Sequence, residues 1–79
     1  MPRYFFDVHD GRIQRDDEGT VCTDLQAAAT AAKRLLPEIT LNELPRGGER
    51  QSYTVLVTDE EGQPVYSAAL SFVGMWLIR

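Results

Sequence analysis

Three polar residues near the N-terminus have the types and the spacing that could do chemistry. Asp7 and His9 are two residues apart in an alternating segment, and Asp10 follows directly. In an extended strand, side chains two residues apart project from the same face, so the Asp7 carboxylate could orient the His9 imidazole. An oriented imidazole can act as a general base or as a metal ligand. We therefore take these three residues as a candidate ligand site, beside the more ordinary explanation of a solvated strand next to a turn.

The rest of the sequence offers little support for catalysis or metal binding. No serine or cysteine nucleophile stands in a recognisable setting, so we expect no catalytic residues and no enzyme activity. Asp16-Asp17-Glu18 and Asp59-Glu60-Glu61 lack the ligand spacing of a calcium loop, and we interpret both as solvated turns. One histidine and one cysteine are too few for a zinc site. We expect neither a metal nor a cofactor.

Length, charge and cysteine content narrow the class of protein. The chain has 79 residues and a net charge of −4. This size predicts one small domain over residues 1–79, and the negative charge argues against a nucleic-acid partner, because a phosphate binder presents a basic face. The single cysteine, Cys22, excludes an internal disulfide. No apolar segment is long enough for a signal peptide or a membrane span, so we expect a soluble cytoplasmic protein with no membrane partner.

One segment, residues 23–44, has a clear helical period. Thr23 and Gln26 have the spacing of a capping box at its start. Pro37 lies inside the segment and predicts a kink or a break, with the residues beyond it in a second helical piece. Apolar residues recur at spacings of three and four and should face the sheet: Leu25, Ala28, Ala32, Leu35 and Ile39.

A first strand hairpin precedes the helix. Residues 3–9 alternate as a strand does. Asp10-Gly11 predicts a two-residue turn that pairs Val8 with Ile13. An alternative remains open, since the first strand could instead pair with residues 20–22 across one longer loop.

A second hairpin follows the helix over residues 51–58 and 64–72. A four-residue loop would put Val55 opposite Tyr66 and both apolar sets on one face, whereas a loop one residue shorter or longer would split them. We therefore predict an α+β fold. One helix, kinked or broken near Pro37, packs on one face of a small, mainly antiparallel sheet in the order β-β-α-β-β.

The expected core lies between the helix and the sheet. Its predicted members alternate along the strands and recur along the helix: Tyr4, Phe6, Val8, Leu25, Ala28, Ala32, Leu35, Ile39, Tyr53, Val55, Val57, Leu70 and Phe72.

The opposite face of the sheet is polar apart from two apolar side chains, and residues 73–79 form an apolar C-terminal tail. A tail this apolar should cover the open face, either in its own chain or in a partner chain. We therefore predict an interaction surface made of Phe5, Leu56, Met75, Trp76 and Leu77.

Several stretches of the sequence also carry a family resemblance. Residues 1–11 (MPRYFFDVHDG), followed by Asp16-Asp17-Glu18-Gly19, resemble a family of short uncharacterised proteins of rhizobia and related alphaproteobacteria. The resemblance covers about residues 2–72, and the tail and Pro37 look unlike the family pattern. The resemblance implies a bacterial, cytoplasmic protein with an intact fold. Because the family is a domain of unknown function, the resemblance does not point to any particular activity.

These observations favour a small non-catalytic protein that acts through protein–protein contact, as a homodimer or with an unknown protein partner. The alternative is a small-ligand or metal-binding protein, with or without enzyme activity, that uses Asp7 and His9.

Overall fold

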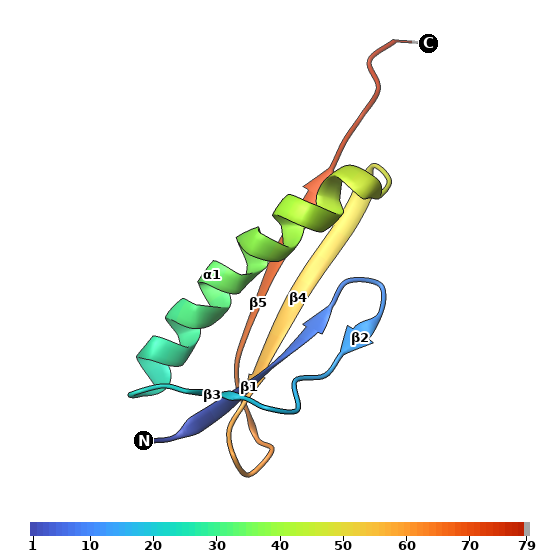
Figure 1. Cartoon of the computed structure of the whole chain (residues 1–79). Coiled ribbons are helices and arrows are strands. Elements are labelled where there is room, and N and C mark those ends of the chain that lie inside the picture. The colour runs from blue at the N-terminus through green and yellow to red at the C-terminus, as the bar shows by residue number, and fades with distance from the viewer. Residues whose placement is uncertain (79) are drawn as a thin grey trace.

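The computed structural model describes residues 1–78 and contains one long helix among short and long strands (Figure 1). The bounds of the elements, in chain order, are β1 Arg3–His9, β2 Ile13–Gln14, β3 Thr20–Val21, α1 Leu25–Glu43, the 3₁₀ helix η1 Leu44–Arg46, β4 Arg50–Thr58 and β5 Pro64–Val73. The predicted α+β class is confirmed, with one helix against an antiparallel sheet. Arg79, the last residue of the predicted tail, lies outside the described residues.

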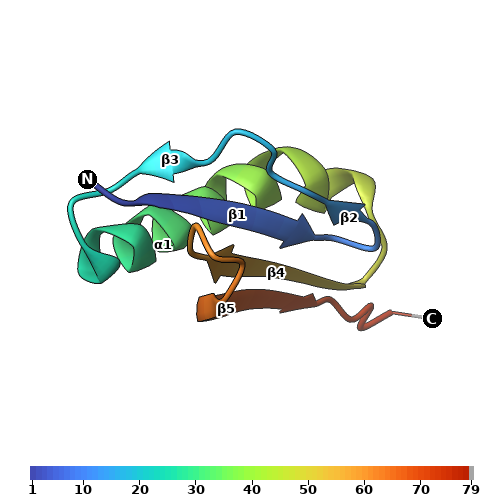
Figure 2. The same cartoon turned by 90° about the horizontal axis from the view of Figure 1, so that it is seen from below.

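The strands form one antiparallel sheet in the order β2-β1-β4-β5, and β3 pairs with β1 as well. Figure 2 shows β2 and β3 along the same edge of β1, while β5 lies at the opposite edge of the sheet. The same view shows α1 behind the sheet, and no helix or strand of residues 1–78 covers the face toward the viewer. The sheet therefore has one buried face and one open face.

The first hairpin differs from the prediction by one residue. His9 pairs with Ile13 and Val8 with Gln14, so the two-residue turn that paired Val8 with Ile13 is wrong. The loop holds three residues, because Gly11 takes a left-handed conformation with φ +98° that closes a longer turn. The open alternative is also present, since Tyr4 pairs with Thr20 in β3.

The second hairpin keeps the predicted faces with a different register. Val55 lies opposite Ala68 rather than Tyr66, and Val57 lies opposite Tyr66. The loop is one residue longer than predicted, and an irregularity beyond Val57 leaves Val65 without an opposite residue. Because these two extra residues change the register by an even number, both apolar sets still face the helix.

The helix begins and continues differently from the prediction. Asp24, in extended backbone, caps α1 by accepting a hydrogen bond from the Ala27 N–H at 2.8 Å, so the capping box on Thr23 is wrong. The helix runs without interruption through Pro37, and the predicted break and second helical piece are wrong. Pro37 is exposed, so water can reach the carbonyl group that its missing N–H leaves unpaired.

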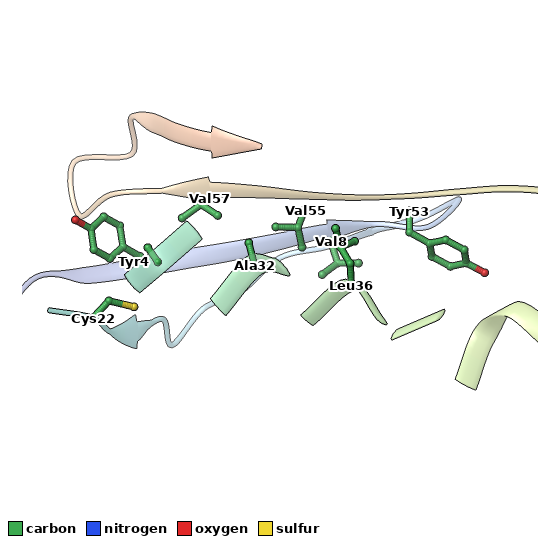
Figure 3. Close-up of a cluster of buried hydrophobic side chains, with 9 residues drawn as sticks. Tyr4, Val8, Cys22, Ala32, Leu36, Tyr53, Val55 and Val57 are labelled. Atoms are coloured by element: carbon green, nitrogen blue, oxygen red, sulfur yellow. The ribbon is translucent and has the colours of Figure 1, made fainter. Parts of the chain in front are cut away.

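The core is smaller than predicted and is centred on β4 (Figure 3). Leu25, as the first residue of the helix, is 50% exposed, and Leu70, on the edge strand, is 41% exposed, so both core assignments are wrong. Leu36 is buried in their place, because the row of α1 that faces the sheet is spaced by four residues. Four further predicted core residues are only partly buried: Phe6, Leu35, Ile39 and Phe72. The buried set is Tyr4, Val8, Cys22, Ala28, Ala32, Leu36, Tyr53, Val55 and Val57.

The tail does not cover the open face of its own chain. The Gly74 N–H donates a hydrogen bond to the Glu49 carbonyl at 2.6 Å, and residues 75–78 then extend away from the sheet (Figure 1). Because β4 begins at Arg50, this chain provides no strand beside the tail beyond Gly74. The prediction that the tail covers the open sheet face of its own chain is therefore wrong.

Candidate functional site

The structure does not bring Asp7 and His9 together as a catalytic or metal-binding pair. The Asp7 Oδ1 accepts a hydrogen bond from the Asp16 N–H at 3.0 Å, while the His9 side chain is exposed. Asp7 thus uses a carboxylate oxygen to hold the chain that follows β2. Within residues 1–78 no three His, Cys, Asp or Glu side chains cluster as metal ligands would.

Among residues 1–78, Asp16 accepts more hydrogen bonds than any other carboxylate. The acidic turn that contains it is solvated at Asp17 and Glu18, which are exposed, whereas Asp16 itself is half-buried. Its Oδ2 accepts the Phe6 N–H at 3.1 Å, and its Oδ1 accepts the N–H groups of Glu18 at 3.1 Å and Gly19 at 3.0 Å. The Phe6 N–H belongs to the stretch of β1 between its pairings with β3 and β2, so Asp16 fills a gap in that edge. The Asp16-x-x-Gly19 spacing was a signal for this turn.

The charge state of Asp16 follows from these contacts. Burial alone raises the pKa of the Asp16 carboxyl. The hydrogen bonds from the Gly19, Phe6 and Glu18 N–H groups and the nearby Arg3 charge outweigh burial and hold this pKa below its ordinary value of 3.8. The carboxylate is therefore ionised at neutral pH and serves as a structural acceptor.

Gly19 fastens the same loop by close packing. Its φ of +73° is left-handed, and a Cβ there would lie 2.8 Å from the Arg3 Cγ and 2.9 Å from the Phe5 Cε2. Arg3 Nη1 also donates to the Glu18 carbonyl at 2.8 Å. The loop between β2 and β3 is thus held firmly against β1, and this edge of the sheet is closed.

Asp10 belongs to a different group of residues, at the end of the molecule where α1 meets β4. It lines a recess of about 180 Å³ together with Glu43, Arg46, Gln51 and Tyr53. The Asp10 Oδ2 accepts a hydrogen bond from Gln14 Nε2 at 3.3 Å, and within residues 1–78 its buried Oδ1 has no partner. The three residues of the predicted ligand site therefore point to three separate environments.

The recess is organised by a hydrogen-bonded tyrosine that the sequence analysis placed only in the core. The Tyr53 hydroxyl donates to Gln51 Oε1, and Gln51 Nε2 donates to the carbonyls of Leu44 and Gly48, both at 2.9 Å. Burial first, and then the charges of Glu43 and Asp10, raise the pKa of the Tyr53 phenol. The phenol stays protonated at neutral pH, and the network ties η1 to β4.

A hollow lies between α1 and the segment that joins β2 to β3. It measures about 400 Å³, with an apolar floor that includes Phe6 and Leu35 and a polar rim that includes Gln14, Arg15 and Asp16. The Asp16 oxygens on this rim already accept three backbone hydrogen bonds. The hollow therefore offers shape and apolar surface and no evident reactive group.

The predicted interaction surface is split between two parts of the molecule. Phe5 and Leu56 are half-buried within the sheet, whereas Met75, Trp76 and Leu77 are 77%, 74% and 89% exposed on the extended tail.

Sequence reasoning missed the feature that lies between these two parts, the free outer edge of β5. This edge strand is ten residues long and contains no charged side chain. Its position at the edge depends on the strand order, which the sequence analysis did not assign; the uncharged stretch PVYSAALSFV was the available signal.

Together these features define a small α+β domain in which a single helix backs a five-stranded antiparallel sheet, with one edge closed by a bonded loop and the other open. Over residues 3–71 the sequence matches the family described as Domain of unknown function (DUF6894), and the chain belongs to this family. The predicted resemblance to an uncharacterised family is thereby confirmed. The match stops at Ser71, before the tail.

No curated protein and no solved structure matches the sequence. Among residues 1–78, α1 is too polar to cross a membrane, and no other helix has the length to do so.

Proposed function

We propose that this protein is a non-catalytic module that acts through protein–protein contact at the outer edge of β5 and the apolar tail, with itself or with another protein. The observation that carries the proposal is the open edge: ten residues of β5 without a charge, continued by an exposed apolar segment. An edge strand offers a row of unpaired N–H and C=O groups to any second strand.

The two edges of the sheet differ in a way that supports this proposal. Proteins usually protect free edges with very short strands, charged side chains, bulges or covering loops. The β1 side has such protection. Its partner β2 is only two residues long, and the Asp16 carboxylate bonds to the Phe6 N–H in the part of β1 that neither β2 nor β3 pairs with. On the β5 side, Pro64 and the irregularity at Val65 disturb pairing only at the start of the strand, and residues 66–73 carry neither a proline nor a charge.

The tail adds an apolar surface that is costly to leave in water. Val73, Met75, Trp76, Leu77 and Ile78 are between 66% and 89% exposed. Burying one such side chain contributes about 1.5–3 kcal/mol, so a partner that covers several of them gains substantial binding energy. Aromatic anchors such as Trp76 often dominate such contacts.

Self-association is the first form of contact to test, by analytical ultracentrifugation over a wide concentration range. The test variant is Leu77→Asp, which places a charge in the tail, and the matched control is Leu41→Asp on α1. Both leucines are highly exposed, 89% and 78%, so neither change removes a core contact. We expect the wild-type chain to form a dimer, Leu77→Asp to weaken it at least about tenfold, and Leu41→Asp to leave it unchanged.

Two outcomes would contradict this form of the proposal. If the wild-type chain stays monomeric at millimolar concentration, a second copy of this chain is excluded as the partner. A dimer weakened equally by Leu77→Asp and Leu41→Asp would place the contact elsewhere or make it a general effect of charge.

The alternative of a small-ligand or metal site at Asp7 and His9 has less support, because Asp7 is bonded to the Asp16 backbone and His9 stands apart in solvent. A thermal-shift series with divalent cations, comparing wild type with His9→Ala, tests it. A stabilisation that His9→Ala removes would favour the alternative. We also propose, from the family resemblance, that the protein works in a bacterial cytoplasm.

A further inference from the structure

We infer that the contact is a reciprocal exchange of tails: residues 74–78 of one copy add as an antiparallel strand to the outer edge of β5 in a second copy. This inference rests on the proposed function and names its partner and its geometry. Among residues 1–78, no strand lies beside the tail beyond Gly74, and none lies on the outer side of β5. Each copy therefore carries both an unpaired strand and an unpaired edge, which are the two halves of a β-strand addition.

Symmetry limits how two such copies can meet. Two identical antiparallel strands are related by a two-fold axis perpendicular to the sheet. Residues directly opposite each other then point to the same face, so even-numbered positions of β5 meet even-numbered positions of the partner. Both copies keep their helices on the same side, and the tail continues the alternation of the strand that it leaves.

The side chains favour the register in which Val73 lies opposite Val73 of the second copy. In this register Trp76 lies opposite Leu70, the large apolar side chain of β5 that its own chain leaves 41% exposed on the helix side. Leu70 borders a hollow of about 150 Å³ that Thr40, Leu44, Tyr53 and Phe72 also line, and the Trp76 ring would close it. Gly74 lies opposite Phe72, where the absence of a side chain leaves room for the aromatic ring.

The odd-numbered tail residues fit the other face in the same register. Met75 lies opposite Ser71 and Leu77 opposite Ala69, both exposed residues with small side chains. An added strand extends the sheet beside β5, so the even-numbered tail residues lie on the helix side and the odd-numbered ones on the open face. On the open face, Met75 and Leu77 contact their neighbours across the strand pair and are covered only in part.

The area available is that of a stable interface. At roughly 150–250 Å² for an aromatic side chain and less for an aliphatic one, the exposed parts of Met75, Trp76, Leu77 and Ile78 amount to on the order of 500 Å². Two reciprocal tails therefore offer about 1,000 Å², and the receiving surfaces of β5 bring the total toward the roughly 1,200–2,000 Å² of specific stable interfaces.

Pairing along the full length of β5 is the competing arrangement, and it leaves the tail without a role. With Ala69 opposite Ala69, Met75 would face Gln63 in the loop before β5, and the residues beyond would run past the sheet into solvent. The most apolar part of the chain would then stay exposed. The register at Val73 instead places the tail along β5 of the second copy, with Trp76 against Leu70.

Single cysteines distinguish the two registers. Residues opposite each other across a two-fold axis are close enough for a disulfide after mild oxidation. We expect Val73→Cys to form a covalent dimer and Ala69→Cys to form little, since both positions are exposed and only their register differs. The wild-type chain is the control for Cys22, which is buried. Adding Leu77→Asp to the Val73→Cys chain should slow the crosslinking at least about tenfold, which separates it from random collision.

Each result bears on a different claim. Efficient crosslinking of Ala69→Cys with little at Val73→Cys would overturn the tail exchange in favour of pairing along the whole strand. A dimer in the ultracentrifuge that neither cysteine crosslinks would also overturn it, while leaving the proposed function in place. A wild-type chain that forms no dimer would remove self-association itself.

Discussion

Replacing Asp16 by asparagine tests how the closed edge of the sheet is held. The asparagine side chain keeps one acceptor oxygen and exchanges the other for an NH₂ group. If the oxygen still accepts the N–H groups of Glu18 and Gly19, the NH₂ group must face the Phe6 N–H, donor against donor. An N–H left without its partner costs about 1–3 kcal/mol, and the two remaining hydrogen bonds also lose the strength that the charge gave them.

Because Asp16 is only half-buried, water can replace part of what is lost. We therefore expect Asp16→Asn to lower the free energy of unfolding by about 1.5–2.5 kcal/mol at pH 7. In a domain of this size that is a fall in Tm of roughly 6–20 °C. Urea unfolding followed by circular dichroism measures the change. The matched control is Asp17→Asn, since Asp17 is exposed, and its effect should stay within about 0.5 kcal/mol.

The effect of Asp16→Asn on the free energy of unfolding should depend on pH, and the lowered pKa of Asp16 sets the sign of this dependence. The folded state lowers the pKa of Asp16, so the ionised carboxylate contributes stability above its ordinary pKa of 3.8. This contribution is lost as the pH falls through the lower pKa of the folded state. The difference in unfolding free energy between wild type and Asp16→Asn should therefore be full at pH 7 and should shrink below pH 3.8. An Asp16→Asn chain as stable as wild type at pH 7, or a difference that persists unchanged in acid, would refute the reasoning.

Three further predictions concern the turn, the helix and the tail. Gly19→Ala should cost about 2–3 kcal/mol by thermal unfolding, because the new Cβ meets Arg3 and Phe5 at a left-handed φ; a cost under about 0.5 kcal/mol would contradict the tight loop. Pro37→Ala should raise the free energy of unfolding by about 1–2 kcal/mol, because it restores a helical N–H. This figure already subtracts the greater entropy of the unfolded chain without proline. A loss of stability would show that the proline ring is needed. The fluorescence of Trp76, the only tryptophan, should shift to shorter wavelength as concentration rises, because association buries its 74% exposed ring; an emission maximum independent of concentration through dimer formation would place Trp76 outside the interface.

Local signals predicted the elements better than their details. Gly11 and Gly62 both marked turns and both adopt left-handed backbone, yet each loop is one residue longer than predicted. The apolar alternation still assigned the faces of β4 and β5 correctly, because the longer loop and the irregularity beyond Val57 together shift the register by two. At the start of the helix two adjacent residues, Thr23 and Asp24, could both serve as caps, and the choice depended on where the chain enters from β3.

The candidate site was predicted less well, because its chemistry depends on neighbours that are distant in sequence. Asp7 and His9 do lie two residues apart on a strand, but Asp7 bonds to the backbone of Asp16 rather than to the imidazole. Asp16 looked like one member of an acidic turn, and only the pairing of β1 with both β2 and β3 shows that its carboxylate completes an edge. Tyr53 was expected in the core, and its hydroxyl network with Gln51 depends on the position of η1.

Residue patterns along the chain were enough to predict one alanine-rich helix, alternating strands, the two faces of the second hairpin and an apolar tail. The order β2-β1-β4-β5, and with it which edge is closed and which is open, followed only from the folded structure. The reason is that side-chain periodicity specifies the face that a strand presents, whereas its neighbour in the sheet is chosen by contacts between distant parts of the chain. The same strand PVYSAALSFV would be an ordinary interior strand between two partners; at the edge of the sheet, one of its sides has no neighbouring strand among residues 1–78.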